Sequence, residues 1–153
     1  MRKAMLFFAV FGLAGSLFGA DPIIGTWKLN DAQSKFSEID PTLKEYIEVY
    51  RELNSGLIEY TQIYVDTKGS SESIKFTWPR QGGIVKAPEN YTTSYVVTLI
   101  APGDWYLTVL LDGKQIGQRH KVISKDGKTM RQTFKGMDLK GKPYDGLHVL
   151  EKQ

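Results

Sequence analysis

The sequence of 153 residues contains no cysteine. Without thiols the chain cannot form disulfides, thiolate metal sites, redox pairs or a cysteine nucleophile. A leader that ends in a lipidated cysteine is excluded for the same reason. The folded domain must therefore be stabilised by the burial of its side chains alone.

Histidine is scarce, and the sequence motifs of common enzymes are missing. The two histidines, His120 and His148, fall on different predicted strands, whereas a zinc site needs three or four ligands. No Gly-x-Ser-x-Gly elbow, phosphate-binding loop or dinucleotide fingerprint occurs. We therefore predict no metal, no cofactor and no catalytic residues. An enzyme that uses Tyr, His or Glu inside a cavity is kept as a third alternative.

Long apolar runs are absent except at the start. Arg2 and Lys3 precede an apolar run from Ala4 to Phe18, and small residues follow it. This pattern is typical of a secretory signal peptide, and the run is shorter than the ~20 apolar residues that a membrane span needs. We expect a signal peptide over residues 1–20, a mature start near Asp21, no membrane anchor after cleavage, and a secreted or periplasmic protein.

An excess of charge of one sign is also missing once the leader is removed. The net charge of +3 includes Arg2 and Lys3, so the remaining chain carries 18 basic against 17 acidic residues. Residues 113–153 are basic and residues 21–112 acidic, which favours complementary solvated faces over a nucleic-acid surface. We predict no nucleic-acid partner. The oligomeric state cannot be read from these features.

What the chain does have is a regular alternation of short apolar segments and turns. Residues 21–153 are long enough for one domain, and their rhythm is typical of antiparallel β-structure. Asp112-Gly113 and Asp126-Gly127 predict tight type I′ hairpins. Strands are expected within the following ranges: 23–29, 46–53, 57–65, 73–78, 92–100, 105–111, 115–124, 128–136 and 144–152. Short links between so many strands favour an all-β, antiparallel up-and-down barrel of about 8–10 strands.

Two segments depart from this rhythm. Residues 41–53 could form a helix, because Asp40 and Pro41 suit a helix start, but their β-branched and aromatic content favours a strand. Residues 79–91 are interpreted as a long loop between two strands. A loop of that length on a rigid scaffold often carries recognition.

The opening "IIGTWKLN" resembles the first-strand signature of the lipocalin and fatty-acid-binding superfamily. The chain as a whole is similar to small exported bacterial lipocalin-like proteins of unassigned activity, through Ser34-Lys35-Phe36, the "SKDGKT" run at Ser124–Thr129 and the "GKP" turn at Gly141–Pro143. This resemblance implies a lipocalin-like barrel and an exported protein more strongly than it implies a function.

The same resemblance implies structural roles for the opening motif. In that superfamily the tryptophan packs across the closed end of the barrel, commonly against a basic side chain from a late strand. Trp27 would then be a plug at the barrel floor, with Arg131 or Arg119 as its cation–π partner. Gly25 would leave room where the first strand bends into the floor.

Fatty-acid binders of that superfamily often carry Arg-x-Tyr in the last strand, where both side chains hold the ligand carboxylate. Here those positions are His148 and Leu150, so the bidentate guanidinium clamp is missing at that spot.

Polar aromatic residues are the best candidates for a ligand site. Tyr46 with Tyr50, and Tyr60 with Tyr64, share strand faces, so they would line a cavity if these faces point inward. If they point outward, Ile47, Val49 and their neighbours fill the core instead, and a register change of one residue reverses the answer. Trp78 and Trp105 lie beside loops that could form the open mouth. The predicted ligand-binding residues are thus Tyr46, Tyr50, Tyr60, Tyr64, Trp78, Trp105 and His148.

These observations favour an exported, non-enzymatic protein that binds a small hydrophobic or amphipathic molecule inside a β-barrel. The alternative is a module that binds a protein or a cell-envelope polymer through its outer strands or through residues 79–91.

Overall fold

The computed structural model describes residues 21–36, 42–86, 93–138 and 140–153. The expected leader, residues 1–20, lies outside the described residues, and so do residues 87–91 of the predicted loop. In the described part no helix is long and apolar enough to span a membrane.

The described chain is built of antiparallel strands and a single turn of 3-10 helix, η1 (Asp31–Gln33). The strands are β1 (Gly25–Leu29), β2 (Lys35–Phe36), β3 (Leu43–Glu52), β4 (Leu57–Asp66), β5 (Ser71–Pro79), β6 (Gly82–Lys86), β7 (Thr93–Ala101), β8 (Asp104–Leu111), β9 (Lys114–Ile123), β10 (Thr129–Met137) and β11 (Pro143–Lys152).

These strands form one continuous sheet that curls into a nearly closed barrel. The order is β5-β4-β3-β1-β11-β10-β9-β8-β7-β6, and the two-residue β2 pairs with β11. The sheet's two edges, β5 and β6, follow each other in the chain, and the described residues show no ladder between them. The predicted lipocalin-like up-and-down barrel is confirmed.

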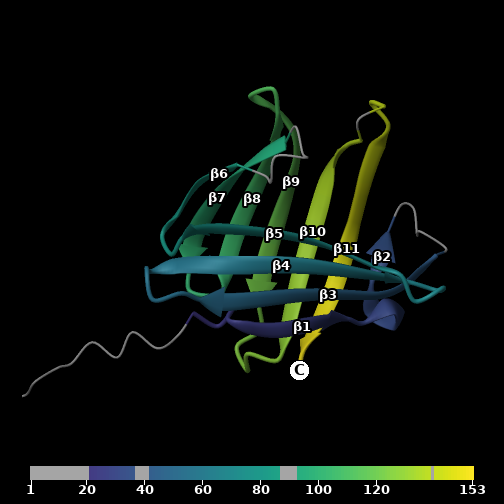
Figure 1. Cartoon of the computed structure of the whole chain (residues 1–153), viewed down its shortest axis with the longest axis horizontal. Helices are drawn as coiled ribbons and strands as arrows, with labels where there is room; N and C mark the ends of the chain where they lie inside the picture. The colour runs from purple at the N-terminus through teal and green to yellow at the C-terminus, as the bar shows by residue number, and fades with distance from the viewer. Residues whose placement is uncertain (1–20, 37–41, 87–92, 139) are drawn as a thin grey trace, which may run out of the picture.

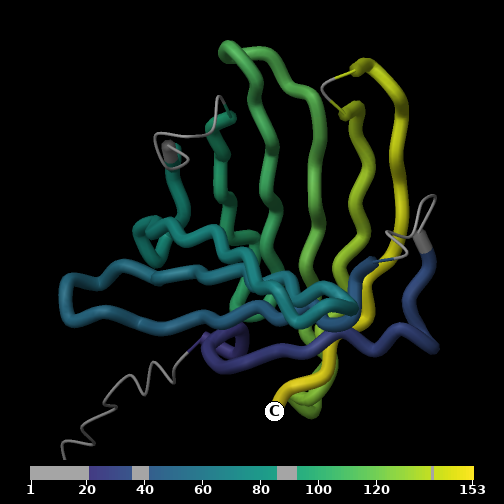
Figure 2. Tube along the Cα trace, turned by 45° about the vertical axis from the view of Figure 1, so that its right-hand side comes forward, coloured from purple at the N-terminus to yellow at the C-terminus, as the bar shows by residue number. Residues whose placement is uncertain are grey.

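The barrel has two walls whose strands cross at a steep angle. In Figure 1, β3, β4 and β5 run across the strands β7 to β11. Figure 2 shows the purple β1 beside the yellow end of β11, where the sheet passes from one wall to the other. Side chains from the inner faces of both walls meet between them and form the core.

The structure shows the secondary structure of the two segments that did not fit the alternation of strands and turns. Residues 43–52 are a strand, as we favoured over a helix. Residues 79–91 were predicted to be a loop, but they contain the strand β6. This strand was missed because it begins with two glycines, and glycine is rare in strand interiors. The polar connection after β1 also contains η1 and β2.

One of the two predicted type I′ turns is present. Asp112 and Gly113 both have positive φ, 49° and 74°, as that turn requires. At the second turn only Gly127 has positive φ, at 70°, so the type I′ prediction was wrong there. The Asp126 carboxylate instead accepts hydrogen bonds from the Ser124 hydroxyl and the Lys128 amide, which stabilise a wider turn.

Candidate functional site

The tyrosine faces of β3 and β4 point into the barrel. Tyr46, Tyr50 and Tyr60 are 1–2% exposed, whereas Ile47 and Val49 on the opposite face are only half-buried. The register question left open by the sequence is thus decided in favour of inward tyrosines. A further consequence is that Glu48, which alternates with them, is also inside the barrel.

Trp27 lies at one end of the barrel, in register with Lys152 at the end of β11, where the resemblance expects it to act as a plug. It is fully buried, and its indole Nε1 donates a hydrogen bond to the carbonyl of Ile23 at 2.7 Å. The cation over its ring is Lys152, whose Nζ lies 5.2 Å from the ring centroid. The predicted partner Arg131 was wrong, because Arg131 points outward and is exposed. Arg119 lies in the barrel interior and is described below.

Gly25 leaves room for the side chain of Lys152. Its φ of 139° favours glycine, and a Cβ there would lie 2.7 Å from Cε of Lys152. The aliphatic stem of Lys152 thus crosses Gly25 on its way to the Trp27 ring. Its Nζ also donates a hydrogen bond to the Pro22 carbonyl at 3.2 Å.

Trp105 and Trp78 lie toward this closed end, so the idea that they mark an open mouth was wrong. Trp105 Nε1 is 3.5 Å from Oδ1 of Asp21, and a Cβ on Gly103 would contact Pro22. Trp78 packs edge-on against Trp105 with ring centroids 6.3 Å apart. Both tryptophans are at most 1% exposed. They are core residues beside the floor.

A buried ion pair occupies the centre of the barrel. Lys121 of β9 donates to both carboxylate oxygens of Glu48, at 3.0 and 2.8 Å, and both side chains are at most 1% exposed. The hydroxyls of Tyr46 and Tyr50 donate to the same carboxylate at 2.6 and 2.5 Å, and the Tyr60 hydroxyl lies 3.0 Å from it. The pair joins the two walls of the barrel.

The pKa shifts in this network have clear causes. Burial alone would raise the pKa of Glu48, but the Lys121 ammonium and the hydrogen bonds to the carboxylate outweigh burial and lower the pKa to about 2. Burial lowers the pKa of Lys121 to about 8, although Glu48 acts in the opposite direction. Burial, followed by the charge of Glu48, raises the pKa of Tyr50 and Tyr60 well above the usual value. At neutral pH the centre is therefore a carboxylate, an ammonium and neutral phenols.

The network extends along β4 toward the other end of the barrel. The Tyr60 hydroxyl lies 2.8 Å from Oε1 of Gln62, and the Gln62 amide donates to the Tyr64 hydroxyl. Tyr64 is half-buried and lines a cleft of about 350 Å³ at the ends of β3, β4 and β5. Leu43 and Glu72 line the same cleft. Tyr64 is the member of the interior network that comes nearest to solvent.

Arg119 adds a second cation to the interior. It lies two residues before Lys121 on the inner face of β9, is half-buried, and has no carboxylate in ion-pair contact within the described residues. Its Nε is buried without a hydrogen-bond partner there. On the neighbouring β10, Gln132 is fully buried and its Oε1 also lacks a partner among the same residues. A donor and an acceptor are thus unused on one stretch of the inner wall.

His148 lies on the inner wall next to these groups. Its Nδ1 is 3.4 Å from Nε2 of Gln132, and its ring packs edge-on against Phe134 and Tyr46, with centroids 4.6 and 5.0 Å away. Burial, followed by the positive charge of Arg119, lowers the pKa of His148 to about 4. The imidazole is therefore neutral at physiological pH and adds no charge to the interior.

A Cβ at Gly146 would meet the Phe134 ring at 2.6 Å. The Phe134 ring therefore lies over a glycine on the inner wall, where a larger residue would displace it.

Sequence reasoning found the tyrosines but missed the charged residues between them. In the sequence, Glu45, Glu48 and Glu59 look alike, as carboxylates on a solvated β-face. Glu45 and Glu59 do face outward and pair with exposed lysines, but Glu48 is buried. The signal that could have found Glu48 is its position midway between Tyr46 and Tyr50.

The second histidine, His120, lies outside the barrel. Its Nε2 is 2.7 Å from Oδ1 of Asp104, a partner that no sequence pattern had indicated. No group of three or more metal-binding side chains occurs in the described ranges.

No family model and no curated protein matches the sequence. Among solved structures, the fluorescent protein UnaG is similar over 85% of this chain and 96% of its own, with 15% identity and a TM-score of 0.58. The zebrafish ileal bile acid-binding protein complexed with cholic acid matches 86% of this chain and 98% of its own, with 14% identity and a TM-score of 0.47. The likeness to UnaG supports the barrel fold.

Proposed function

We propose that this protein is an exported, non-enzymatic binding protein that holds a small amphipathic molecule with an acidic head group inside its barrel. The observation that carries the proposal is Arg119, an interior cation that no described carboxylate neutralises.

The charges around the centre of the barrel do not balance without a ligand. Glu48 and Lys121 neutralise each other, and His148 is neutral, so Arg119 leaves this part of the inner wall with one positive charge in excess. The other buried carboxylate, Asp21, lies beside Trp105. A guanidinium stays charged at physiological pH, and an unpaired charge removed from water is costly. An anionic group of a ligand would remove this cost and form charge-assisted hydrogen bonds.

The surroundings of Arg119 suit the rest of an amphipathic molecule. Tyr46, Phe134 and His148 present ring faces and edges beside it. Tyr64 is half-buried and lines the cleft at the ends of β3, β4 and β5, so this cleft would be the ligand's route in. Ligand sites of this kind combine mostly apolar walls with a few polar groups that fix orientation.

A head-group comparison tests the proposal. Dodecanoate, 1-dodecanol and dodecylamine share one chain length and differ in charge, and calorimetric titration with each compares their affinities. We expect dodecanoate to bind at least about tenfold more tightly than the other two, and Arg119→Gln to abolish that difference. The matched control is Arg131→Gln, which removes an exposed arginine from the outer face of the same barrel. Equal affinities for the acid and the alcohol would refute the acidic head group.

Export rests on the leader pattern and on the packing of the residues that follow it. Asp21 is 7% exposed and Ile23 1%, so the folded domain begins where the leader is predicted to end. N-terminal sequencing of the protein from its own host should give a start at Asp21. A chain that retains Met1 would contradict the proposal.

A further inference from the structure

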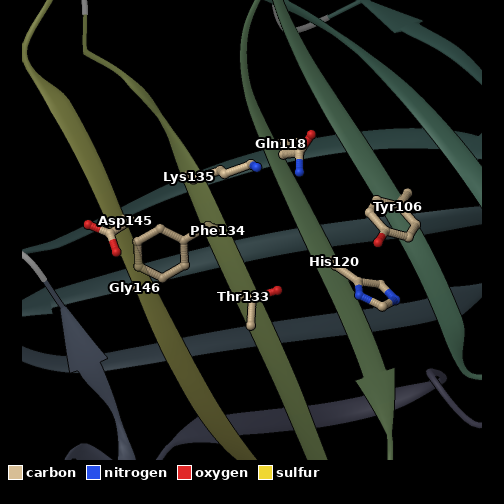
Figure 3. Close-up of a pocket in the computed structure, with 8 residues that line it drawn as sticks. All are labelled: Tyr106, Gln118, His120, Thr133, Phe134, Lys135, Asp145 and Gly146. Carbon is tan, nitrogen blue, oxygen red and sulfur yellow. The ribbon is translucent and has the colours of Figure 1, made fainter.

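The outer face of β8 to β11 carries two adjoining clefts, which meet the interior site only at Phe134. The first, of about 370 Å³, is lined by side chains that include Tyr106, His120, Gln118, Thr133, Lys135 and Asp145 (Figure 3). The second, of about 540 Å³, shares Gln118, Lys135 and Asp145 with the first and continues to Ile116, Met137 and Pro143. Because they share three residues, the two clefts form one groove along the strands.

Strand register explains why these side chains converge. His120 lies opposite both Tyr106 and Thr133, so these three form one row across β8, β9 and β10. Lys135 lies opposite both Gln118 and Asp145, which form the next row. Residues in both rows are outward-facing, because Arg119, Lys121 and Gln132 between them point inward. Figure 3 shows both rows on one side of the sheet.

One end of the groove is an ordered aromatic pair. The rings of Tyr106 and His120 are stacked, with centroids 4.1 Å apart and planes within 8°. Asp104 holds the imidazole in place through its Nε2 at 2.7 Å. Tyr106 is 36% exposed, more than any other tyrosine among the described residues. Each ring covers one face of the other, so the pair offers its outer ring faces and edges as rigid apolar area, together with the phenol hydroxyl of Tyr106.

The middle of the groove is polar but close to neutral. Lys135 and Asp145 carry opposite charges and lie side by side, and Thr133 and Gln118 add a hydroxyl and an amide. The far end is apolar, with Met137 55% exposed. The groove thus alternates apolar surface with hydrogen-bonding groups and has no net charge to attract an ion.

We propose that this groove binds a segment of a neutral oligosaccharide. A sugar ring has an apolar C–H face that stacks on aromatic side chains and hydroxyl edges that both donate and accept hydrogen bonds, which matches the order of groups along the groove. An extended peptide is less suitable, because it binds best as an added strand at a sheet edge. Here β8, β9, β10 and β11 are each paired on both sides, so their backbone groups are already used. The proposal does not depend on a ligand inside the barrel.

The test is an NMR titration of the isotope-labelled protein with three neutral probes: cellohexaose, chitohexaose and maltohexaose. We expect at least one to shift the amide signals of β8 to β11 and to bind about tenfold more weakly to Tyr106→Ala. Tyr106→Phe, which keeps the stacking ring, should retain most of the affinity. The matched control is Thr98→Ala, an exposed residue opposite Tyr106 on the β7 side and outside the groove.

Two further binding measurements distinguish oligosaccharide binding in the groove from ligand binding inside the barrel. Prior saturation with dodecanoate should leave oligosaccharide binding unchanged, and Arg119→Gln should do the same. The inference is overturned if none of the probes binds at millimolar concentration, if the shifts lie outside β8 to β11, or if Tyr106→Ala binds as well as the unmodified protein. Far-ultraviolet circular dichroism of Tyr106→Ala shows whether the variant is folded.

Discussion

Glu48 lies on β3 between two tyrosines that donate hydrogen bonds to it, and its charge is balanced by Lys121 from the opposite wall. A buried ion pair of this kind adds little net stability compared with apolar residues, but loss of one member leaves an unpaired charge in the core. The effect of a substitution therefore depends on whether the partner is still present.

This dependence gives the first prediction. Glu48→Gln and Lys121→Met should each lower the free energy of unfolding by about 3–5 kcal/mol. The double variant should lose at least ~2 kcal/mol less than the sum of the two, because neither charge is left alone and the introduced amide can still accept hydrogen bonds from the tyrosines. Urea unfolding at pH 7 measures all four proteins.

An exposed pair on the same sheet is the control. Lys75 and Glu59 lie 3.3 Å apart, with the lysine side chain 56% exposed. The same double-mutant cycle there should give a coupling of about 0–1 kcal/mol. Similar couplings at the two pairs would show that burial does not set the cost.

At this scale the sequence predicts which residues share a strand face but not which face is inside. The alternation places Tyr46, Glu48 and Tyr50 together whatever the register. The inward direction was hidden because the opposite face carries Ile47 and Val49, which are equally good core residues. Arg119 and Gln132 were out of reach, since their importance comes from unpaired atoms that only packing reveals.

Among the elements, the strands and hairpins follow directly from local sequence. Alternation and turn dipeptides predicted nine of the strands, and the observed bounds differ by a few residues. The elements that were missed are the ones stabilised by tertiary contact: β6 pairs with β7 despite its glycines, and the two-residue β2 exists only through β11. Local propensity carries little information about such segments.

Gly25 is the first residue of β1 and determines how closely the side chain of Lys152 can approach this strand. Gly25→Ala should lower the free energy of unfolding by about 2–3 kcal/mol, since the new Cβ has an unfavourable φ and meets Lys152. It should also displace the lysine from the Trp27 ring. Urea unfolding gives the first effect, and the Trp27 contribution to near-ultraviolet circular dichroism gives the second.

Gly56→Ala is the matched control. Gly56 has a φ of 75°, also in the glycine region, but a Cβ there would contact nothing within 4 Å. Its cost should be about 1 kcal/mol, from the backbone alone. If both variants cost the same, the contact with Lys152 contributes nothing to the role of Gly25.

For the whole molecule, the buried groups predict that stability falls in acid in two stages. The folded-state pKa of His148, about 4, lies below its ordinary value of 6.5, so the unfolded chain binds the proton first as the pH falls through this range. Glu48, with a pKa of about 2 against 4.5, causes a second loss below pH 4.5. Stability from both groups is complete only above about pH 6.5.

Urea unfolding at pH 7, 5.5 and 4 measures the first stage. We expect a loss of about 2 kcal/mol between pH 7 and pH 4, most of it absent in His148→Asn. His120→Asn serves as the control, because that ring lies on the outer surface of the barrel beside Asp104. An equal loss in His148→Asn and the unmodified protein would mean that other groups govern acid sensitivity.

The order of strands in the sheet has a consequence for how the barrel forms. Most ladders join strands that are neighbours in the chain, so they can close as hairpins at low entropic cost. The exceptions with large sequence separation both involve β11, which must find β1 and β2. Formation of the seam, the ladders that join β11 to β1 and β2, should therefore be the slow step of folding. Trp27, which pairs in register with Lys152 across the seam, is placed to report that step through its fluorescence.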